Sequence, residues 1–439
     1  MKKSSNTTEY LGFKEICAVS LMLFAMFFGA GNMIFPPTLG AAAGENVFTA
    51  LLGYVMGDAG LAILGIAAVS LIGQDLHDLG NLVGKKFAVV FALAIYLLIG
   101  PLFALPRTAT VSFEITIVPF LSGESKLLAS VIFTSIFFFL AYYLSRNPKK
   151  IVEIVGKILT PLLLFSIALI FITALLNPYG EIGQATGGYQ DYPFFTGFIE
   201  GYNAVDGPAG LAFAAVVITA IRGIGLRSEK AIAKYTIISG FGSGVVLAIV
   251  YFALAYLGAH SGALGTFENG GQMLIAIANT TTGKIGVFLL SIAVLLACIT
   301  TAIGLITAFG EYISVQYPRI SYQAAILATT LFSLVISNVG LTTLIKFSLP
   351  VLLIIYPVTI IISLQAFFAK LVGNRRGFYW LGLLFTFIVS VILSLDSLNI
   401  SLSFLSSFVQ ALPLYDAGVA WFLPAVVGSL LGLLIPAKK

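Results

Sequence analysis

Runs of about twenty or more apolar residues recur along almost the whole of this 439-residue chain. Hydrophobic residues make up 59% of the sequence and charged residues 9%, and the mean hydropathy is +1.05. Soluble domains carry about a quarter charged residues, so a water-soluble fold could not cover this much apolar surface. A helix that spans a bilayer needs roughly 20 apolar residues. The sequence therefore predicts an all-α polytopic membrane protein that is embedded in the lipid bilayer.

The apolar runs and the loop signals between them predict about twelve membrane spans. Their approximate limits are 14–41, 47–73, 86–106, 125–144, 157–176, 195–221, 234–258, 285–312, 322–338, 344–369, 378–395 and 417–436. The stretch 107–122 is not assigned to a span, and 396–416 is expected to form an outer surface helix or loop. The longest outer loops are 177–194 and 259–284. Because the loops are short, we expect one integral membrane domain, 1–439.

Positive charge is distributed unequally between the two sides of the predicted membrane. The loops on the side of the N-terminus carry 19 of the 23 Lys and Arg residues. The other four are Arg107, Lys126, Lys284 and Lys346. Cytoplasmic loops of membrane proteins carry the excess of Lys and Arg, so both termini are expected to be cytoplasmic.

Two of the predicted spans are interrupted by residues that break helices. Span 1 contains Phe27–Pro37 (FFGAGNMIFPP), and span 6 contains Gly201–Gly210 (GYNAVDGPAG), with Asp206 at membrane depth. Glycine weakens a helix, and proline removes a backbone donor and clashes with the preceding turn. The backbone groups that such breaks free cannot be satisfied by lipid, so they must meet protein, water or a ligand.

The two breaks occupy corresponding positions in five-span units of opposite orientation. This pattern is typical of inverted-repeat transporters, in which half-helix ends bind the substrate near the membrane midplane. A free α-amino acid suits such a site, because exposed N–H groups would receive its carboxylate and freed carbonyls its ammonium group. The alternatives are close helix packing for the glycines and capping of a half-helix for Asp206, although a buried Asp in a membrane indicates function by default.

Span 8 offers oxygen ligands on one helical face. Ala297, Thr300 and Thr301 are spaced at i, i+3 and i+4. Two hydroxyls and a carbonyl are the hard oxygen ligands that a small cation requires. The alternative is that each threonine hydroxyl bonds back to its own helix.

Other classes of function find little support in the sequence. A membrane enzyme would need clustered acids and histidines or a nucleophile with its base, whereas His77 and His260, the two histidines, lie in separate loops. An ion channel, a further alternative, is normally built from several subunits around polar rings. We therefore expect neither an enzyme nor a cofactor, and no nucleic-acid partner.

With these motifs the chain resembles the bacterial branched-chain amino acid:cation symporters of the amino acid–polyamine–organocation superfamily. The resemblance covers essentially the whole chain and rests on GAGNMIFPP, IGPLFALPRTA at 99–109, GYNAVDGPAGLAFA and ITTAIGL. It implies a LeuT-like five-plus-five inverted repeat, with repeat one at about 14–176, repeat two at 195–369 and peripheral helices at 378–436.

The resemblance also implies a function. It is secondary active uptake of Leu, Ile and Val, coupled to Na⁺ or H⁺ by alternating access, across a bacterial plasma (inner) membrane. A transporter of another apolar or small amino acid in the same superfamily is the alternative.

The resemblance assigns roles to residues at matching positions. Backbone amides would take the substrate carboxylate, span 6 carbonyls would take its ammonium group, and residues beside the breaks would line an apolar pocket. The implied substrate-binding residues are Phe28, Gly29, Ala30, Gly31, Ala204, Val205 and Asp206. The implied cation ligands are Ala25, Phe28, Ala297, Thr300 and Thr301, with Asn32 at a second sodium site.

Arg107 and Glu114 lie seven residues apart near the outer end of span 3. We interpret them as interfacial charges, with pairing across a vestibule as the alternative.

Overall fold

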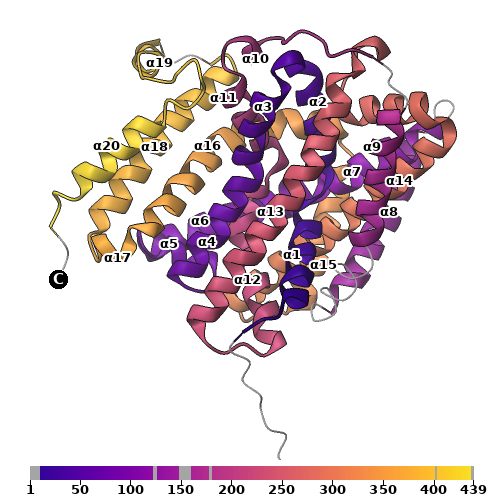
Figure 1. Cartoon of the computed structure of the whole chain (residues 1–439). Helices are drawn as coiled ribbons and strands as arrows, with labels where there is room; N and C mark the ends of the chain where they lie inside the picture. The colour runs from indigo at the N-terminus through magenta and orange to yellow at the C-terminus, as the bar shows by residue number, and fades with distance from the viewer. Residues whose placement is uncertain (1–9, 122–125, 148–159, 177–179, 401–402, 437–439) are drawn as a thin grey trace, which may run out of the picture.

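The computed structural model describes residues 10–121, 126–147, 160–176, 180–400 and 403–436, which are almost entirely helical (Figure 1). Eight helical segments within these ranges are long and apolar enough to cross a membrane. Three shorter apolar helices accompany them: α9 (Thr160–Leu176), α15 (Tyr322–Ser337) and α20 (Phe422–Gly432). The predicted all-α membrane architecture is confirmed, while the count of twelve spans stays a prediction. The terminal residues 1–9 and 437–439 and the predicted start of span 5 lie outside the described residues.

Spans 1 and 6 are each broken into two helices, as predicted. Span 1 consists of α1 (Phe13–Phe27) and α2 (Ala30–Ala43). Span 6 consists of α11 (Pro193–Glu200), the 3-10 turn η7 (Gly201–Ala204) and α12 (Asp206–Ile224). In Figure 1, α1 and α12 lie toward one end of the bundle and α2 and α11 toward the other, so the two spans run in opposite directions.

The second expected interruption of span 1, at Pro36 and Pro37, does not occur. Both prolines lie inside α2, which continues to Ala43. A proline inside a helix removes one bond to the carbonyl four residues earlier, and here the neighbouring turns keep the helix continuous. The break falls at Phe28 and Gly29, where the backbone of Gly29 is extended (φ −125°, ψ −150°).

Spans 2 and 3 also depart from regular α-helix, although both were expected to be ordinary runs. Span 2 is α3 (Val47–Val55), a π turn η2 (Met56–Gly60) and α4 (Leu61–Ile72). Span 3 is α6 (Lys85–Leu97), η3 (Leu98–Leu102) and α7 (Ala104–Thr116). Gly100, beside Pro101, has a non-helical backbone. The chain bends there and continues as α7 through most of the stretch that had not been assigned to a span.

Nine further α-helices complete the described part of the chain. They are α5 (Leu76–Gly80), α8 (Lys126–Ser145), α10 (Gly188–Asp191), α13 (Glu229–Ala259), α14 (Gly270–Gln316), α16 (Leu341–Phe367), α17 (Ala369–Val372), α18 (Arg376–Ser397) and α19 (Ser403–Gln410). The expected outer loop 259–284 is largely helical, because α14 begins at Gly270 and breaks at Gly283, where φ is +62°. Helix α19 lies in the segment predicted as an outer helix or loop.

Glycines allow the half-helices α2 and α11 to pack closely on their neighbours. Gly40 and Gly258 lie at the contact between α2 and α13, and Gly53 and Gly197 lie at the contact between α3 and α11. A Cβ at any of the four would overlap the backbone of the facing helix. Small residues that let backbones approach in this way are typical of membrane helix interfaces. The contacts hold α2 against α13 and α11 against α3.

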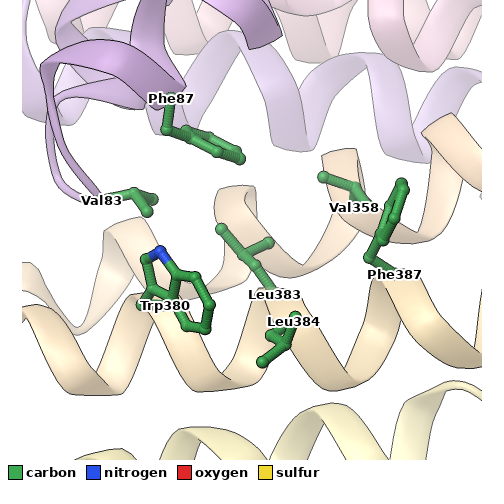
Figure 2. A pocket seen from close by; sticks show the side chains of 7 residues that line it. All are labelled: Val83, Phe87, Val358, Trp380, Leu383, Leu384 and Phe387. Atoms are coloured by element: carbon green, nitrogen blue, oxygen red, sulfur yellow. The ribbon is translucent and has the colours of Figure 1, made fainter.

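Helices α18 and α20 pack on each other at one side of the bundle (Figure 1). An apolar pocket of about 230 Å³ opens between α6, α16 and α18 (Figure 2). The residues that line it are Val83, Phe87, Val358, Trp380, Leu383, Leu384 and Phe387. Its single side-chain polar atom is the indole nitrogen of Trp380 (Figure 2). A ligand site needs a few convergent polar groups, so this pocket is not a candidate for binding an amino acid.

Candidate functional site

A side-chain hydrogen bond joins the two helix breaks. Asn32, in the first turn of α2, donates through Nδ2 to Oδ2 of Asp206 at 2.7 Å. Asp206 is the first residue of α12 and makes no capping bond to that helix. Both side chains are buried. The capping role considered for Asp206 is therefore absent, and its carboxylate instead links α12 to span 1.

Asn32 also connects to spans 2 and 7. Its Nδ2 lies 2.5 Å from the hydroxyl oxygen of Tyr251 and 3.4 Å from Oδ2 of Asp58, and Tyr251 donates its own hydroxyl hydrogen to Asp58. Its Oδ1 accepts the N–H of Gly29 at 3.0 Å, which caps the broken end of α2. We call Asn32, Asp58, Asp206 and Tyr251 the four-residue cluster. It takes one residue from each of spans 1, 2, 6 and 7.

Sequence reasoning missed Asp58 and Tyr251. Asp58 is fully buried in the π turn η2. The string Gly57-Asp58-Ala59-Gly60 lies in the middle of predicted span 2 and combines an acid with glycines, as the span 6 break does. An acid at membrane depth is a functional candidate by default, so this signal was available. Tyr251 offered none, because it lies in an unbroken apolar run.

Arg107 is buried in the site, and the prediction that it is an interfacial charge was wrong. Its Nη1 donates to the carbonyl of Asn203 at 2.6 Å, and its Nη2 donates to the carbonyl of Ala204 at 3.1 Å. Its guanidinium carbon lies 5.5 Å from the centroid of the Phe35 ring. The bend at η3 brings α7 against the span 6 break, where freed carbonyls attract a cationic donor. Glu114 instead pairs with Lys126, at 3.3 Å.

The turn in span 6 is conformationally unusual. Val205 has a left-handed backbone (φ 75°, ψ 11°), which is an outlier for a β-branched residue. Beyond it, the N–H of Gly207 donates to the hydroxyl of Tyr356 at 3.3 Å, and the Tyr356 ring stacks on Tyr202 with centroids 4.2 Å apart. Strained backbone of this kind clusters at ligand sites, where surrounding contacts hold it in place.

A small cavity lies where the breaks meet, and we call it the closed cavity because it is too small to hold an amino acid. About 20 Å³ of it is open to the centre of a water molecule, which is room for about one water. Among the residues predicted to bind substrate, those that line it are Gly29, Ala30, Gly31, Ala204, Val205 and Asp206. The first-turn N–H groups of α2 have no acceptor within their own helix. The structure therefore brings together the two predicted halves of the polar site, in a closed form.

The apolar wall of the cavity differs from the expected one. Phe28 is not among the lining residues, and its ring stacks on Phe24 with centroids 5.1 Å apart. The neighbouring Phe27 lines the cavity and contacts Phe213, with centroids 5.3 Å apart. The apolar lining includes Met26, Phe27, Phe213 and Leu305. A branched aliphatic side chain would meet apolar surface on this side.

The predicted cation ligands of spans 1 and 8 also converge. The hydroxyl of Thr300 lies 2.9 Å from the carbonyl oxygens of both Ala25 and Ala297, and the Thr301 hydroxyl lies 3.3 Å from that of Ala25. The Thr300 hydroxyl thus bonds back to the Ala297 carbonyl of its own helix, which was the alternative to a cation site. It also reaches the Ala25 carbonyl of α1. Phe28 ends α1 with ψ at 89°, so its carbonyl leaves the helical direction. Neutral oxygens gathered from two helices suit a small hard cation.

A larger vestibule lies at the end of the bundle where α12 and α14 terminate. Its volume is about 410 Å³, and its charged lining residues are Asp75, Arg222 and Glu311. Ala212 of α12 and Ala308 of α14 line this vestibule, whereas Phe213 and Leu305 of the same helices line the closed cavity. On both helices, the residues that line the two spaces therefore lie within one helical turn of each other.

Solved structures share this fold. The chain is similar to a closed, bromovinylhydantoin-bound structure of Mhp1, a nucleobase-cation-symport-1 family transporter, with a TM-score of 0.62 and 14% identity, covering 100% of this chain and 97% of that one. It is also similar to MhsT in complex with L-phenylalanine, with a TM-score of 0.55 and 14% identity, covering 95% and 98% of the two chains. The predicted LeuT-like fold is therefore confirmed.

Sequence relatives identify the family. The chain is 42% identical over 424 residues to the branched-chain amino acid permease BraB of Bacillus subtilis, covering 96% of this chain and 95% of the relative. It is 38% identical to the branched-chain amino acid transport system 2 carrier protein of Pseudomonas aeruginosa, covering 97% of each. The profile of the family described as "Branched-chain amino acid transport protein" matches residues 13–439. This protein belongs to the branched-chain amino acid transport protein family.

Proposed function

We propose that this protein carries leucine, isoleucine and valine into a bacterial cell by secondary active transport driven by Na⁺ or H⁺. The single observation that carries the proposal is the meeting of the two helix breaks at one buried cavity, where Asn32 bonds to Asp206. The names of the relatives, branched-chain amino acid permeases and carriers, support this choice of substrate.

The substrate would lie between the two breaks. Ala30 and Gly31 line the cavity at the positive end of α2, where first-turn N–H groups favour a carboxylate. The carbonyls at the span 6 break and the Asp206 carboxylate favour the ammonium group. Phe27 and Phe213 would contact the branched side chain. The closed cavity must widen to admit a whole amino acid.

The coupling cation would bind between spans 1 and 8. Its ligands would be the carbonyls of Ala25, Phe28 and Ala297 and the hydroxyls of Thr300 and Thr301, of which the two hydroxyls and the Ala25 carbonyl already lie within hydrogen-bonding distance. A cation there holds the broken end of α1 in the geometry that the substrate also requires. Each ligand would therefore raise the affinity for the other.

Transport would proceed by alternating access in a bacterial plasma membrane with both termini cytoplasmic. The excess of Lys and Arg in the loops on the side of the N-terminus supports a cytoplasmic position for the vestibule of α12 and α14. Phe213 and Leu305 line the closed cavity on the same two helices that line the vestibule, so their side chains would form the barrier between the two spaces. Movement of these side chains would release substrate and cation inward.

Uptake by proteoliposomes under imposed gradients tests the proposed function. Purified protein is expected to accumulate labelled leucine when a Na⁺ or an H⁺ gradient is imposed alone, and to exchange labelled for unlabelled leucine when no gradient is present. The identity of the active gradient names the coupling ion. Unlabelled isoleucine and valine should compete. Absence of leucine exchange, in protein that remains monodisperse, would contradict the proposed function.

Removing the Thr300 hydroxyl is expected to weaken the response of uptake to the cation. Thr300→Ala deletes an oxygen that lies 2.9 Å from the Ala25 carbonyl, so the cation concentration for half-maximal uptake should rise roughly tenfold or more. The measurement is leucine uptake against cation concentration at equal protein. Thr281→Ala is the control, because that hydroxyl bonds to carbonyls of its own helix. An unchanged cation response in Thr300→Ala and in Thr301→Ala would remove both residues from the site.

A further inference from the structure

We infer that Arg107 is the residue that recognises the substrate carboxylate. In this closed form its guanidinium donates hydrogen bonds to the carbonyls that receive the substrate ammonium group. The inference rests on the proposed function and adds to it an exchange of partners. On binding, the carboxylate draws the guanidinium away from the carbonyls of Asn203 and Ala204, and the ammonium group takes its place.

The first observation is that Arg107 is a buried cation whose hydrogen bonds go to carbonyls and not to a carboxylate. It is 4% exposed, and among the described residues no carboxylate lies within ion-pair distance of it. A guanidinium has five N–H donors, whereas the hydrogen bonds described for Arg107 use two, and its Nε has no partner. A buried charge is costly unless it is paired. Arg107 therefore has both the charge and the free donors to accept an anion.

The second observation is where those donors lie. A Cβ built on Gly31 would be 2.7 Å from Nη2 of Arg107 and 2.9 Å from Cα of Ala204. Gly31 lines the cavity in the first turn of α2, where backbone N–H groups have no acceptor within their own helix. An anion bound to this turn would therefore also contact the guanidinium. Arginine binds carboxylates through two parallel hydrogen bonds, and such bonds are both strong and selective in geometry.

The third observation is what Arg107 binds now. The carbonyls of Asn203 and Ala204 accept hydrogen bonds from a cationic nitrogen donor at 2.6 and 3.1 Å. An ammonium group supplies the same charge and the same kind of donor. An amino acid carries an anion for Arg107 and a cation for the carbonyls. After the exchange, both the guanidinium and the carbonyls would therefore have a partner. A simple amine would displace Arg107 without giving it an anion.

The exchange predicts opposite effects of one substitution on two ligands. Equilibrium binding to purified protein is measured for labelled leucine and for isopentylamine, which is leucine without its carboxylate. Arg107→Met removes the guanidinium while keeping a long side chain. Leucine should bind roughly 30-fold or more weakly, the typical loss when one partner of a buried charge pair is removed. Isopentylamine should bind about tenfold or more tightly than to the wild type, because the carbonyls no longer hold a competing cation.

Two further variants complete the experiment. Arg376→Met is the matched control, since Arg376 is exposed at the start of α18, and both affinities should be unchanged. Arg107→Lys keeps the charge without the two-pronged geometry, so it should bind leucine with an affinity between those of the wild type and Arg107→Met. If Arg107→Met does not fold, Arg107→Lys replaces it in the test. The ratio of the affinity for isopentylamine to the affinity for leucine should then be higher in Arg107→Lys than in the wild type.

Two outcomes would overturn the exchange. One is an equal loss of affinity for both ligands in Arg107→Met and Arg107→Lys, which indicates a structural role. The other is unchanged leucine binding. Both are distinct from a wild-type protein that binds no leucine, which contradicts the proposed function itself.

Discussion

Asp58→Asn and Asp58→Ala are both expected to lose gradient-driven leucine uptake, by about 100-fold or more. Asp58 is fully buried in a π turn of span 2 and accepts hydrogen bonds from Tyr251 and Asn32. In the proposed function, the two carboxylates of the four-residue cluster would hold the positive charge of an ammonium group or of a coupling ion. Asparagine keeps the shape and removes that charge. Uptake and exchange in proteoliposomes measure the effect.

The two substitutions separate function from folding. The amide of Asp58→Asn still accepts the Tyr251 hydroxyl bond, so thermal stability should change little. Asp58→Ala leaves Tyr251 without that acceptor. The free energy of unfolding should fall by about 1–3 kcal/mol for each buried polar group that loses its partner. Asp191→Asn, at an exposed position in α10, is the control for the chemical change. Wild-type uptake by Asp58→Asn would show that the carboxylate charge is not needed.

Gly31→Leu is expected to abolish leucine uptake while the protein still folds. A Cβ at this position would already lie 2.7 Å from Nη2 of Arg107 and 2.9 Å from Cα of Ala204. The larger side chain would fill a cavity that has room for about one water. It would also separate α2 from the span 6 break. The loss should exceed about 100-fold, because misplacement of a binding group by 1 Å has effects of that size.

The control for this change is Gly223→Leu, at an exposed glycine of α12 with no atom within 4 Å of the added Cβ. Its uptake should equal that of the wild type. Elution as a single monodisperse peak in size-exclusion chromatography distinguishes lost binding from unfolding. Substantial leucine uptake by Gly31→Leu would place the substrate elsewhere.

The broken helices could be predicted because their cause is local. Glycine and proline act on the backbone of their own turn. The expected orientation of the spans likewise rests on a local signal, the charge of the loops. The same local signal existed at Asp58, but an acid between glycines in span 2 was treated as part of an ordinary apolar run. Its meaning depends on Tyr251, which is 193 residues away.

Arg107 illustrates the limit of such reasoning. In the sequence it stands near the predicted end of an apolar run, where interfacial charges are common. Its burial depends on the bend at Gly100 and on the freed carbonyls of Asn203 and Ala204, which are distant in sequence. Phe27 rather than Phe28 lines the cavity for a related reason. The exact residue at which a helix ends decides which side chain faces inward, and helix ends are uncertain by one or two residues.

The bonds from Arg107 to the span 6 carbonyls bear on how tightly such a carrier is sealed when no cargo is bound. Bare carbonyls deep in a membrane would attract water and stray ions, and each such visit is a route for leakage down the gradient that powers uptake. A guanidinium fixed to the protein occupies these carbonyls but cannot itself cross the membrane. If the inferred exchange occurs, Arg107 would block these carbonyls until a molecule bearing both an ammonium and a carboxylate group displaces it.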